Sequence, residues 1–277
     1  MTRPFALIAG LLLSLAVQAA DTYSFGVLSQ RSPVLTAEYW NPILDYAGKK
    51  AGVNLLLRVA RTGPESNAAI ARGEYDFTYS NHLFKPANLA QDYQVILRSR
   101  ETAIKGQIVT LAGSAVGRLA DLQGLEVGFP SRAAFVGYAV PMDHLIRSGI
   151  AVIPVFGGNQ EGIIGQLQAG KIMAAAVNDQ VIKAYALREG LRYRVLWESE
   201  SYDNIPIAVH PRVDKSVVES VRQALAGMND DPAGRKVLEA SAAVIRQKPP
   251  YGFVPGNQKD YRNYLDFYRN TVVKDLE

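Results

Sequence analysis

The sequence predicts an α/β fold in two lobes, each built on a parallel-rich sheet flanked by helices. Three observations carry this prediction. Short apolar segments alternate with amphipathic segments along most of the chain, which is typical of alternating strands and helices. Two such series occur, and a mainly helical stretch follows them. The length of 277 residues suits two lobes of ordinary size.

The first residues of the chain, 1–19, predict a signal peptide that is not part of the fold. Arg3 precedes an apolar run from Phe5 to Val17, and small residues then lead to a cleavage site at Ala19. The alternative, a membrane anchor, is disfavoured because this run is shorter than the roughly 20 residues that span a bilayer. We therefore expect cleavage near Ala19 and export to the periplasm.

The first lobe is predicted to combine residues 20–108 with residues 207–277. Its longest early helix is indicated by Trp40, Ile43 and Leu44, which recur at helical spacing. The terminal helices have no strands of their own, so we expect them to pack back on this lobe. The expected elements are strands at residues 23–28, 54–59 and 75–79, and helices at residues 36–52, 63–73, 214–227, 231–241 and 258–277.

The second lobe is predicted over residues 109–206. The chain is expected to enter it along a strand at residues 106–111 and to return along a strand at residues 205–210. Two crossing strands form a hinge, and hinged lobes often close over a ligand. The expected strands are at residues 125–129, 151–156, 172–177 and 192–198. Helices are expected after Pro130-Ser131 to about Ser148, at residues 160–169, and directly after the strand at residues 172–177.

Several functions are disfavoured by residue types and motifs. The sequence has no cysteine, and its three histidines are far apart, so we expect no metal site and no cofactor. The segment Gly165–Ile172 matches the phosphate loop GxxxxGK, but Ile172 stands where Ser or Thr must bind magnesium. A glycine that ends a helix is the simpler interpretation. No GxSxG nucleophile motif occurs, and we expect no enzyme.

The charge pattern argues against nucleic-acid binding. The formal net charge is +4, and the basic residues are scattered among acidic ones, as in Arg188-Glu189 and Lys259-Asp260. A nucleic-acid site requires a basic patch or stripe, which this distribution does not predict.

Polar residues stand where predicted strands lead into helices. In open α/β sheets, ligands bind beyond the carboxyl ends of the strands, where helix N-termini can hold anions. Each such residue alone is consistent with a helix cap, and Asn81 is expected to cap one. Together they predict a cleft lined by Ser29-Gln30, Tyr79-Ser80-Asn81, Ser131, Asn159-Gln160 and Asn178-Asp179.

Five motifs follow one another along the chain: GVLSQ (26–30), Trp40-Asn41-Pro42, GEYDFTYSN (73–81), LADLQGLEVGFPS (119–131) and YGFVPGNQKDYRNYLDFYR (251–269). In this order and spacing they resemble the phosphate/phosphite/phosphonate-binding proteins of ABC importers. The resemblance covers nearly the whole chain after residue 20 and implies a type II periplasmic-binding-protein fold.

The resemblance implies roles for particular residues at the ligand's oxyanion. Tyr79, Ser80 and Asn81 match the family's first-lobe contacts. Ser131 matches the start of its second-lobe hydroxyl turn, and Asp179 occupies its acidic junction. Gln30 and Asn178, which follow predicted strands, are further candidate ligand-binding residues.

Two departures from the family pattern concern ligand specificity. The hydroxyl turn reads Ser131-Arg132-Ala133 here, or Ala134-Phe135-Val136 if it is aligned on Gly137 and Pro141. Gln160 stands in place of the family's loop histidine. Fewer charge-assisted donors weaken recognition of a tetrahedral oxyanion. Either Arg132 compensates, or the ligand is a different small molecule.

These patterns predict a solute-binding protein that captures a small polar ligand, most simply a phosphonate- or phosphate-like oxyanion. Its expected partner is an ABC permease in the inner membrane. An alternative is a periplasmic sensing module that signals to a membrane receptor or kinase. A periplasmic enzyme on the same scaffold is a further alternative.

Overall fold

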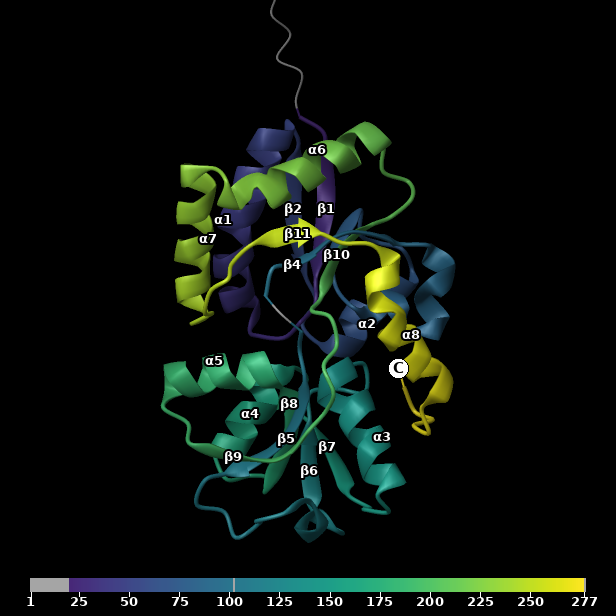
Figure 1. Cartoon of the computed structure of the whole chain (residues 1–277), viewed down its shortest axis with the longest axis vertical. Coiled ribbons are helices and arrows are strands. Elements are labelled where there is room, and N and C mark those ends of the chain that lie inside the picture. Colours follow the sequence, from purple (N-terminus) through teal and green to yellow (C-terminus); the bar gives the residue numbers. More distant parts are fainter. Residues whose placement is uncertain (1–19, 102, 277) are drawn as a thin grey trace, which may run out of the picture.

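The chain forms two α/β units in the computed structural model, which describes residues 20–101 and 103–276 (Figure 1). The predicted signal peptide, residues 1–19, lies outside the described residues. The strands are β1 (Thr22–Val27), β2 (Asn54–Val59), β3 (Phe77–Tyr79), β4 (Gln94–Ser99), β5 (Gly106–Leu111), β6 (Glu126–Phe129), β7 (Ile153–Phe156), β8 (Ala174–Asn178), β9 (Tyr193–Glu198), β10 (Pro206–Val209) and β11 (Phe253–Pro255). The α-helices are α1 (Pro33–Ala51), α2 (Gly63–Ala71), α3 (Val140–Arg147), α4 (Gln160–Gln168), α5 (Asp179–Glu189), α6 (Lys215–Ala226), α7 (Pro232–Val244) and α8 (Arg262–Asn270).

The first sheet has six strands in the order β11-β4-β10-β3-β1-β2. β1 pairs in parallel with β2 and β3, whereas β10 lies antiparallel between β3 and β4. All four residues of β10 are buried, as expected for an apolar run in the middle of a sheet. The predicted parallel arrangement holds for β2-β1-β3, and the remaining pairs are antiparallel.

The second sheet has five strands in the order β7-β6-β8-β5-β9. β6 pairs in parallel with β7 and β8, and β5 pairs antiparallel with β8 and β9. All five residues of β8, with sequence AAAVN, are buried. A strand covered on both faces is usually a continuous apolar run, which is why the sequence predicted this strand well.

Helix α1 packs against α6 and α7 on one side of the first sheet (Figure 1). The Ser32 hydroxyl caps its N-terminus by accepting a hydrogen bond from the Leu35 N–H (3.3 Å). Its predicted apolar stripe, with Trp40, Ile43 and Leu44, is buried. No helix within residues 20–101 and 103–276 is long and apolar enough to cross a membrane.

Two connections join the sheets, one between β4 and β5 and the other between β9 and β10. Ile104 and Tyr202 exchange backbone hydrogen bonds of 2.7 and 2.9 Å between them. The crossing points therefore lie beside the predicted ones, because β5 pairs wholly within the second sheet and β10 within the first. The predicted boundaries after residues 108 and 206 fall inside these two strands. Strand periodicity does not reveal to which sheet a strand belongs.

The C-terminus departs from the predicted helix. α8 ends at Asn270, and residues 271–276 continue as a segment without regular structure. This segment lies on the second unit, where Val273 is buried in the core. The Thr271 hydroxyl and the Val272 N–H both donate to the Asp143 carboxylate of α3 (2.8 Å each). The terminal residues therefore pack on both units rather than on the first alone.

Three further predictions of local structure need correction. β4 and β11 were not expected: β4 alternates buried and partly exposed residues, and β11 has three residues held by pairing with β4. Asn81 precedes a short 3₁₀ turn (His82–Phe84) and makes no side-chain cap. The segment after Ser131 begins with a π-helical turn, Phe135–Ala139, before α3.

Candidate ligand-binding site

The two units meet in a cleft that is closed in this structure. The Gly63 N–H at the start of α2 donates to the Gly158 carbonyl (3.2 Å), and the Glu161 N–H of α4 donates to the Gln30 carbonyl (3.2 Å). The Arg31 guanidinium lies 3.9 Å from the Glu161 carboxylate. Each of these contacts joins one unit to the other.

Gly63 permits this approach because it has no side chain. A Cβ atom at this position would collide with the Ser131 hydroxyl of the second unit. Thr62 caps α2 directly before it by accepting a hydrogen bond from the Glu65 N–H (3.3 Å). The helix therefore begins with a bare backbone against the other lobe.

A cavity of about 30 Å³, here called the inner chamber, lies within the closed cleft. Segments that follow strands of both sheets line it, as the sequence predicted for a ligand site. Seven residues predicted to line the cleft meet here: Ser29, Gln30, Asn81, Ser131, Asn159, Gln160 and Asn178. Five of them are nearly inaccessible to solvent, and Gln30 and Asn159 are partly exposed.

N-terminal residues of four helical segments also line the inner chamber. They belong to α2, α4 and the π-helical turn that begins at Phe135, and the fourth is Asn178, the N-cap residue of α5. Asn159 and Asn178 cap α4 and α5, whereas the turn at Phe135 has no side-chain cap. Helix N-termini carry partial positive charge. The first backbone N–H groups of α2 and α5 already donate to protein oxygens, as from Gly63 to Gly158 and from Asp179 to Lys105, so these two helix ends contribute their dipole rather than free donors. No charged side chain of the described residues lines this chamber.

Amide side chains supply further polar groups to the inner chamber. The Gln160 Oε1 atom accepts a hydrogen bond from the Asn178 N–H (3.0 Å), which orients the Gln160 amide. The Oδ1 atom of Asn81 is buried and has no hydrogen-bond partner among the described residues. A buried polar atom without a partner is costly, so this position favours a polar ligand.

His82 lines the inner chamber beside Asn81 and is uncharged at neutral pH. Burial, assisted by the nearby positive charge of Lys85, lowers the pKa of His82 to about 3. Its ring therefore offers a neutral hydrogen-bonding group. Sequence reasoning did not single out this histidine, although it directly follows the predicted Tyr79-Ser80-Asn81 junction.

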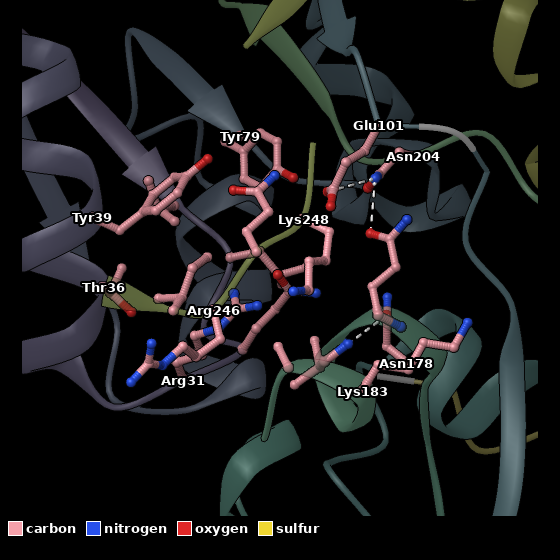
Figure 2. Close-up of a pocket in the computed structure, with 18 of the residues that line it drawn as sticks. Arg31, Thr36, Tyr39, Tyr79, Glu101, Asn178, Lys183, Asn204, Arg246 and Lys248 are labelled. Carbon is pink, nitrogen blue, oxygen red and sulfur yellow. Dashed lines mark hydrogen bonds between the residues drawn. The ribbon is translucent and has the colours of Figure 1, made fainter. Parts of the chain in front are cut away.

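A second cavity of about 150 Å³, here called the outer chamber, adjoins the first (Figure 2). The two share Leu28, Gln30 and Asn178 as lining residues. The predicted residue Tyr79 lies in the outer chamber, where its ring centroid is 4.8 Å from that of Trp40. Other walls come from α1, α5, the hinge and the segment after α7.

The outer chamber is mainly basic. Arg31, Lys183, Arg246 and Lys248 line it, and Glu101 is the single acidic residue among its described lining residues. Burial raises the pKa of Glu101. Figure 2 shows Glu101 beside Asn204 on one side and Arg31 with Arg246 on the other.

Three predicted site residues line neither chamber. The Ser80 hydroxyl accepts a hydrogen bond from the His82 N–H (3.1 Å). The Asp179 carboxylate accepts hydrogen bonds from the Lys105 N–H (2.9 Å) and the Lys183 ammonium (2.9 Å), so it binds the hinge and its own helix.

Arg132 is the third of these residues. Its guanidinium lies 4.9 Å from the centroid of the Phe156 ring and pairs with the Asp275 carboxylate. Ser131 and Arg132 are neighbours in sequence, but Ser131 lines the inner chamber and Arg132 contacts the C-terminal segment.

No pattern in the sequence pointed to most residues of the outer chamber. Tyr39 lies within a helix, Glu101 lies beside the hinge, and Arg246 and Lys248 follow a helix far along the chain. Their positions depend on packing between distant segments. The expectation that ligand-binding residues follow the ends of strands does not identify them.

The arrangement suits binding of an anion. Neutral donors and helix N-termini surround the inner chamber, and cations surround the outer one. No group of three or more His, Asp or Glu side chains that could hold a metal ion occurs among the residues that the structure describes.

A fold of two hinged α/β units, closed over polar cavities, defines a two-lobe solute-binding protein. The family described as "ABC transporter, phosphonate, periplasmic substrate-binding protein" matches residues 25–261. The chain belongs to this family of periplasmic substrate-binding proteins, as the sequence motifs predicted. A comparison with curated proteins finds no match.

Solved structures confirm the fold at low sequence identity. PhnD1 from Prochlorococcus marinus, in complex with methylphosphonate, has a TM-score of 0.74 and 13% identity over 90% of this chain and 97% of its own. A binding protein component of an ABC phosphonate transporter from Pseudomonas aeruginosa has a TM-score of 0.77 and 13% identity over 90% and 87%. XAC2383 from Xanthomonas citri, bound to chloride, has a TM-score of 0.71 and 15% identity over 90% and 96%.

Proposed function

We propose that this protein captures a phosphonate- or phosphate-like oxyanion in the inner chamber and delivers it to an ABC permease in the inner membrane. The observation that carries the proposal is the convergence of polar side chains and helix N-termini from both lobes on one chamber. A ligand seated there contacts both lobes together. It therefore binds the closed state better than the open one and shifts the equilibrium toward closure.

The missing hydroxyls of the second-lobe turn are compatible with this role. Ala134, Phe135 and Val136 carry no hydroxyl, but they line the inner chamber at a helix start without a side-chain cap. Backbone N–H groups at such a position bind anions whatever the side chains are. We assign the oxyanion to these N–H groups together with the Ser131 hydroxyl and the side-chain N–H of Gln160. The Asn81 Oδ1 atom accepts hydrogen bonds, so we assign to it the hydroxyl of a protonated phosphonate or phosphate.

The predicted residues outside the inner chamber have supporting roles in this proposal. The Asp179 carboxylate accepts a hydrogen bond from the backbone N–H of the hinge residue Lys105. Arg132 anchors the turn after Ser131 to Asp275. Tyr79 forms part of the outer chamber. None of the three is assigned a direct contact with the oxyanion.

The family assignment also supports the proposed location and partner. A periplasmic substrate-binding protein is exported, so we propose that residues 1–19 are removed near Ala19. We further propose that the chain binds and releases its ligand without chemical change. The family favours a permease as partner over the sensor receptor that the sequence left open.

Thermal unfolding of the mature protein tests this function. A ligand that binds the native state and not the unfolded state raises the melting temperature, and the rise grows with the logarithm of the ligand concentration relative to its Kd. We expect methylphosphonate, phosphite or phosphate to raise it, and Ser131→Ala to reduce that rise. Ser216→Ala, on the exposed face of α6, is the matched control and should respond like the wild type. If none of these anions raises the melting temperature of the folded protein, the proposal is wrong.

A further inference from the structure

The outer chamber is larger than the inner chamber and opens from the same cleft. Their volumes are about 150 and 30 Å³, and Leu28, Gln30 and Asn178 line both. A ligand whose oxyanion occupies the inner chamber can therefore extend its substituent into the outer one. Methylphosphonate or inorganic phosphate has no substituent that would fill this space.

The walls of the outer chamber suit an organic group. Tyr39, Trp40 and Tyr79 form a continuous aromatic wall, with ring centroids 5.4 Å apart in the first pair and 4.8 Å apart in the second. Val181 and Leu187 of α5 contribute apolar surface from the other lobe. Binding an organic substituent here would bury apolar surface on both partners.

The cations of the outer chamber are incompletely neutralised. Within residues 20–101 and 103–276, no carboxylate lies in ion-pair distance of Arg246 or Lys248. The Arg31 pair with Glu161 is long at 3.9 Å, and the buried Nε atom of Arg31 has no hydrogen-bond partner. These side chains have donors left for a ligand.

Arg246 lines the outer chamber from a strained backbone conformation. Its φ angle is 54°, in the left-handed region that favours glycine. A residue other than Gly or Asn in this region is strained by about 1 kcal/mol or more, and such residues cluster at ligand-binding positions. A glycine at this position would relieve the strain. The presence of arginine instead indicates that its side chain has a role.

We propose that the natural ligand carries a second anionic group on its organic substituent, and that Arg246 and Lys248, with Arg31, bind this group in the outer chamber. This inference rests on the proposed function. Figure 2 shows Arg31 and Arg246 on the other side of the outer chamber from Glu101, so we place the second group on that side. The ligand class is then an organic phosphonate or phosphate ester with an additional carboxylate or phosphoryl group.

Glu101 provides a different basis for ligand selection in the outer chamber. A carboxylate that accepts a hydrogen bond from the Asn204 amide (3.5 Å) can also bind an ammonium group. If Glu101 selected the ligand, a substituent with a positive charge would bind best. The experiment must therefore include an aminophosphonate.

Calorimetric titration with a matched ligand series tests the inference. The series contains methylphosphonate, phosphonocarboxylates of increasing chain length, their uncharged carboxamides and an aminoalkylphosphonate. We expect the best carboxylate to bind about two- to fivefold tighter than its carboxamide, as for a partly exposed ion pair. In Arg246→Gln/Lys248→Gln, this preference should disappear, while the affinity for methylphosphonate changes by less than about twofold.

Lys215→Gln/Lys236→Gln removes the same charge from exposed positions on α6 and α7 and is the control. It should retain the preference. Equal binding of carboxylate and carboxamide, tighter binding of the aminophosphonate, or a preference that survives the Arg246/Lys248 change would overturn the inference and leave the proposed function intact. If methylphosphonate and the entire series fail to bind, both are wrong.

Discussion

Arg132 and Asp275 form an ion pair that joins the turn beside the inner chamber to the C-terminal segment. The Tyr138 hydroxyl donates to the same carboxylate, with distances of 2.9 Å to each of its oxygens. Because Ser131 directly precedes Arg132, the position of the chamber wall depends on residues at the end of the chain. This relationship explains why Arg132 is directed away from the cleft.

The first prediction concerns this anchor. Asp275→Asn should weaken ligand binding by about two- to fivefold, because the Arg132 pair is partly exposed and the Tyr138 hydrogen bond is weakened. Asp266→Asn, which alters an exposed pair with Arg269 on α8, should have no effect on affinity. Calorimetric titration measures both. Equal affinities for Asp275→Asn and the wild type would show that the anchor does not position the site.

The second prediction concerns closure of the lobes. Gly63→Ala should reduce ligand affinity by at least about tenfold, because its Cβ would meet the Ser131 hydroxyl across the cleft. The melting temperature without ligand should change little, since alanine favours a helix. Gly165→Ala in α4 has room for a Cβ atom and is the matched control. Small-angle scattering should show that Gly63→Ala stays open with ligand; a closed, full-affinity variant would contradict this account.

The third prediction concerns the Ser131 hydroxyl. Ser131→Ala should cost about 1.5–3 kcal/mol of binding free energy for a charged ligand, and about 0.5–1.5 kcal/mol for a neutral one. The size of the loss in titrations therefore reports the ligand's charge at this point. Ser216→Ala should bind like the wild type. An unchanged affinity in Ser131→Ala would remove Ser131 from the site.

The fourth prediction concerns pH. Burial raises the pKa of Glu101, so the native state binds its proton more tightly than the unfolded state does. The free energy of unfolding should therefore fall as pH rises from the ordinary glutamate pKa of about 4.3 through the raised value. Glu101→Gln should remove this part of the slope and be more stable than the wild type at neutral pH. Exposed Glu239→Gln is the control in denaturant titrations at several pH values; identical slopes for all three proteins would exclude this effect.

The fifth prediction separates the backbone of Arg246 from its side chain. Arg246→Gly should keep or raise stability, because glycine accepts the left-handed conformation at φ 54°. It should nevertheless lower affinity for a phosphonocarboxylate while preserving that for methylphosphonate. Thermal unfolding and titration measure the two effects. A destabilised variant with full affinity would mean that Arg246 serves the fold rather than the ligand.

Local sequence patterns predicted much of the fold. The apolar run at β8 and the helical spacing of Trp40, Ile43 and Leu44 both correspond to buried elements. β11 was missed because three residues carry no periodicity, and its strand conformation depends on pairing with β4. The two predicted crossings between the lobes lie a few residues away from the observed ones for the same reason, because distant partners determine which sheet a strand joins.

The residues that line the two chambers were predictable where they follow strands and unpredictable where their position depends on packing. Ser131 and Asn81 lie in the inner chamber because strand ends of each sheet face the cleft. Asp179 also follows a strand. Its carboxylate accepts a hydrogen bond from the backbone N–H of Lys105 and therefore lies outside the chamber. Arg246 reaches the cleft only through the packing of α7 on α1, which no local motif reports.

A crystal structure of the mature protein with bound methylphosphonate tests the central claim most directly. We predict phosphonate density in the inner chamber, with its oxygens within about 3.2 Å of the Ser131 hydroxyl and of backbone N–H groups in the segment that begins at Phe135. Both lobes should contact it, and the Gly63–Gly158 hydrogen bond should be present. Phosphonate bound outside the cleft, or a cleft without phosphonate at saturating concentration, would contradict the account.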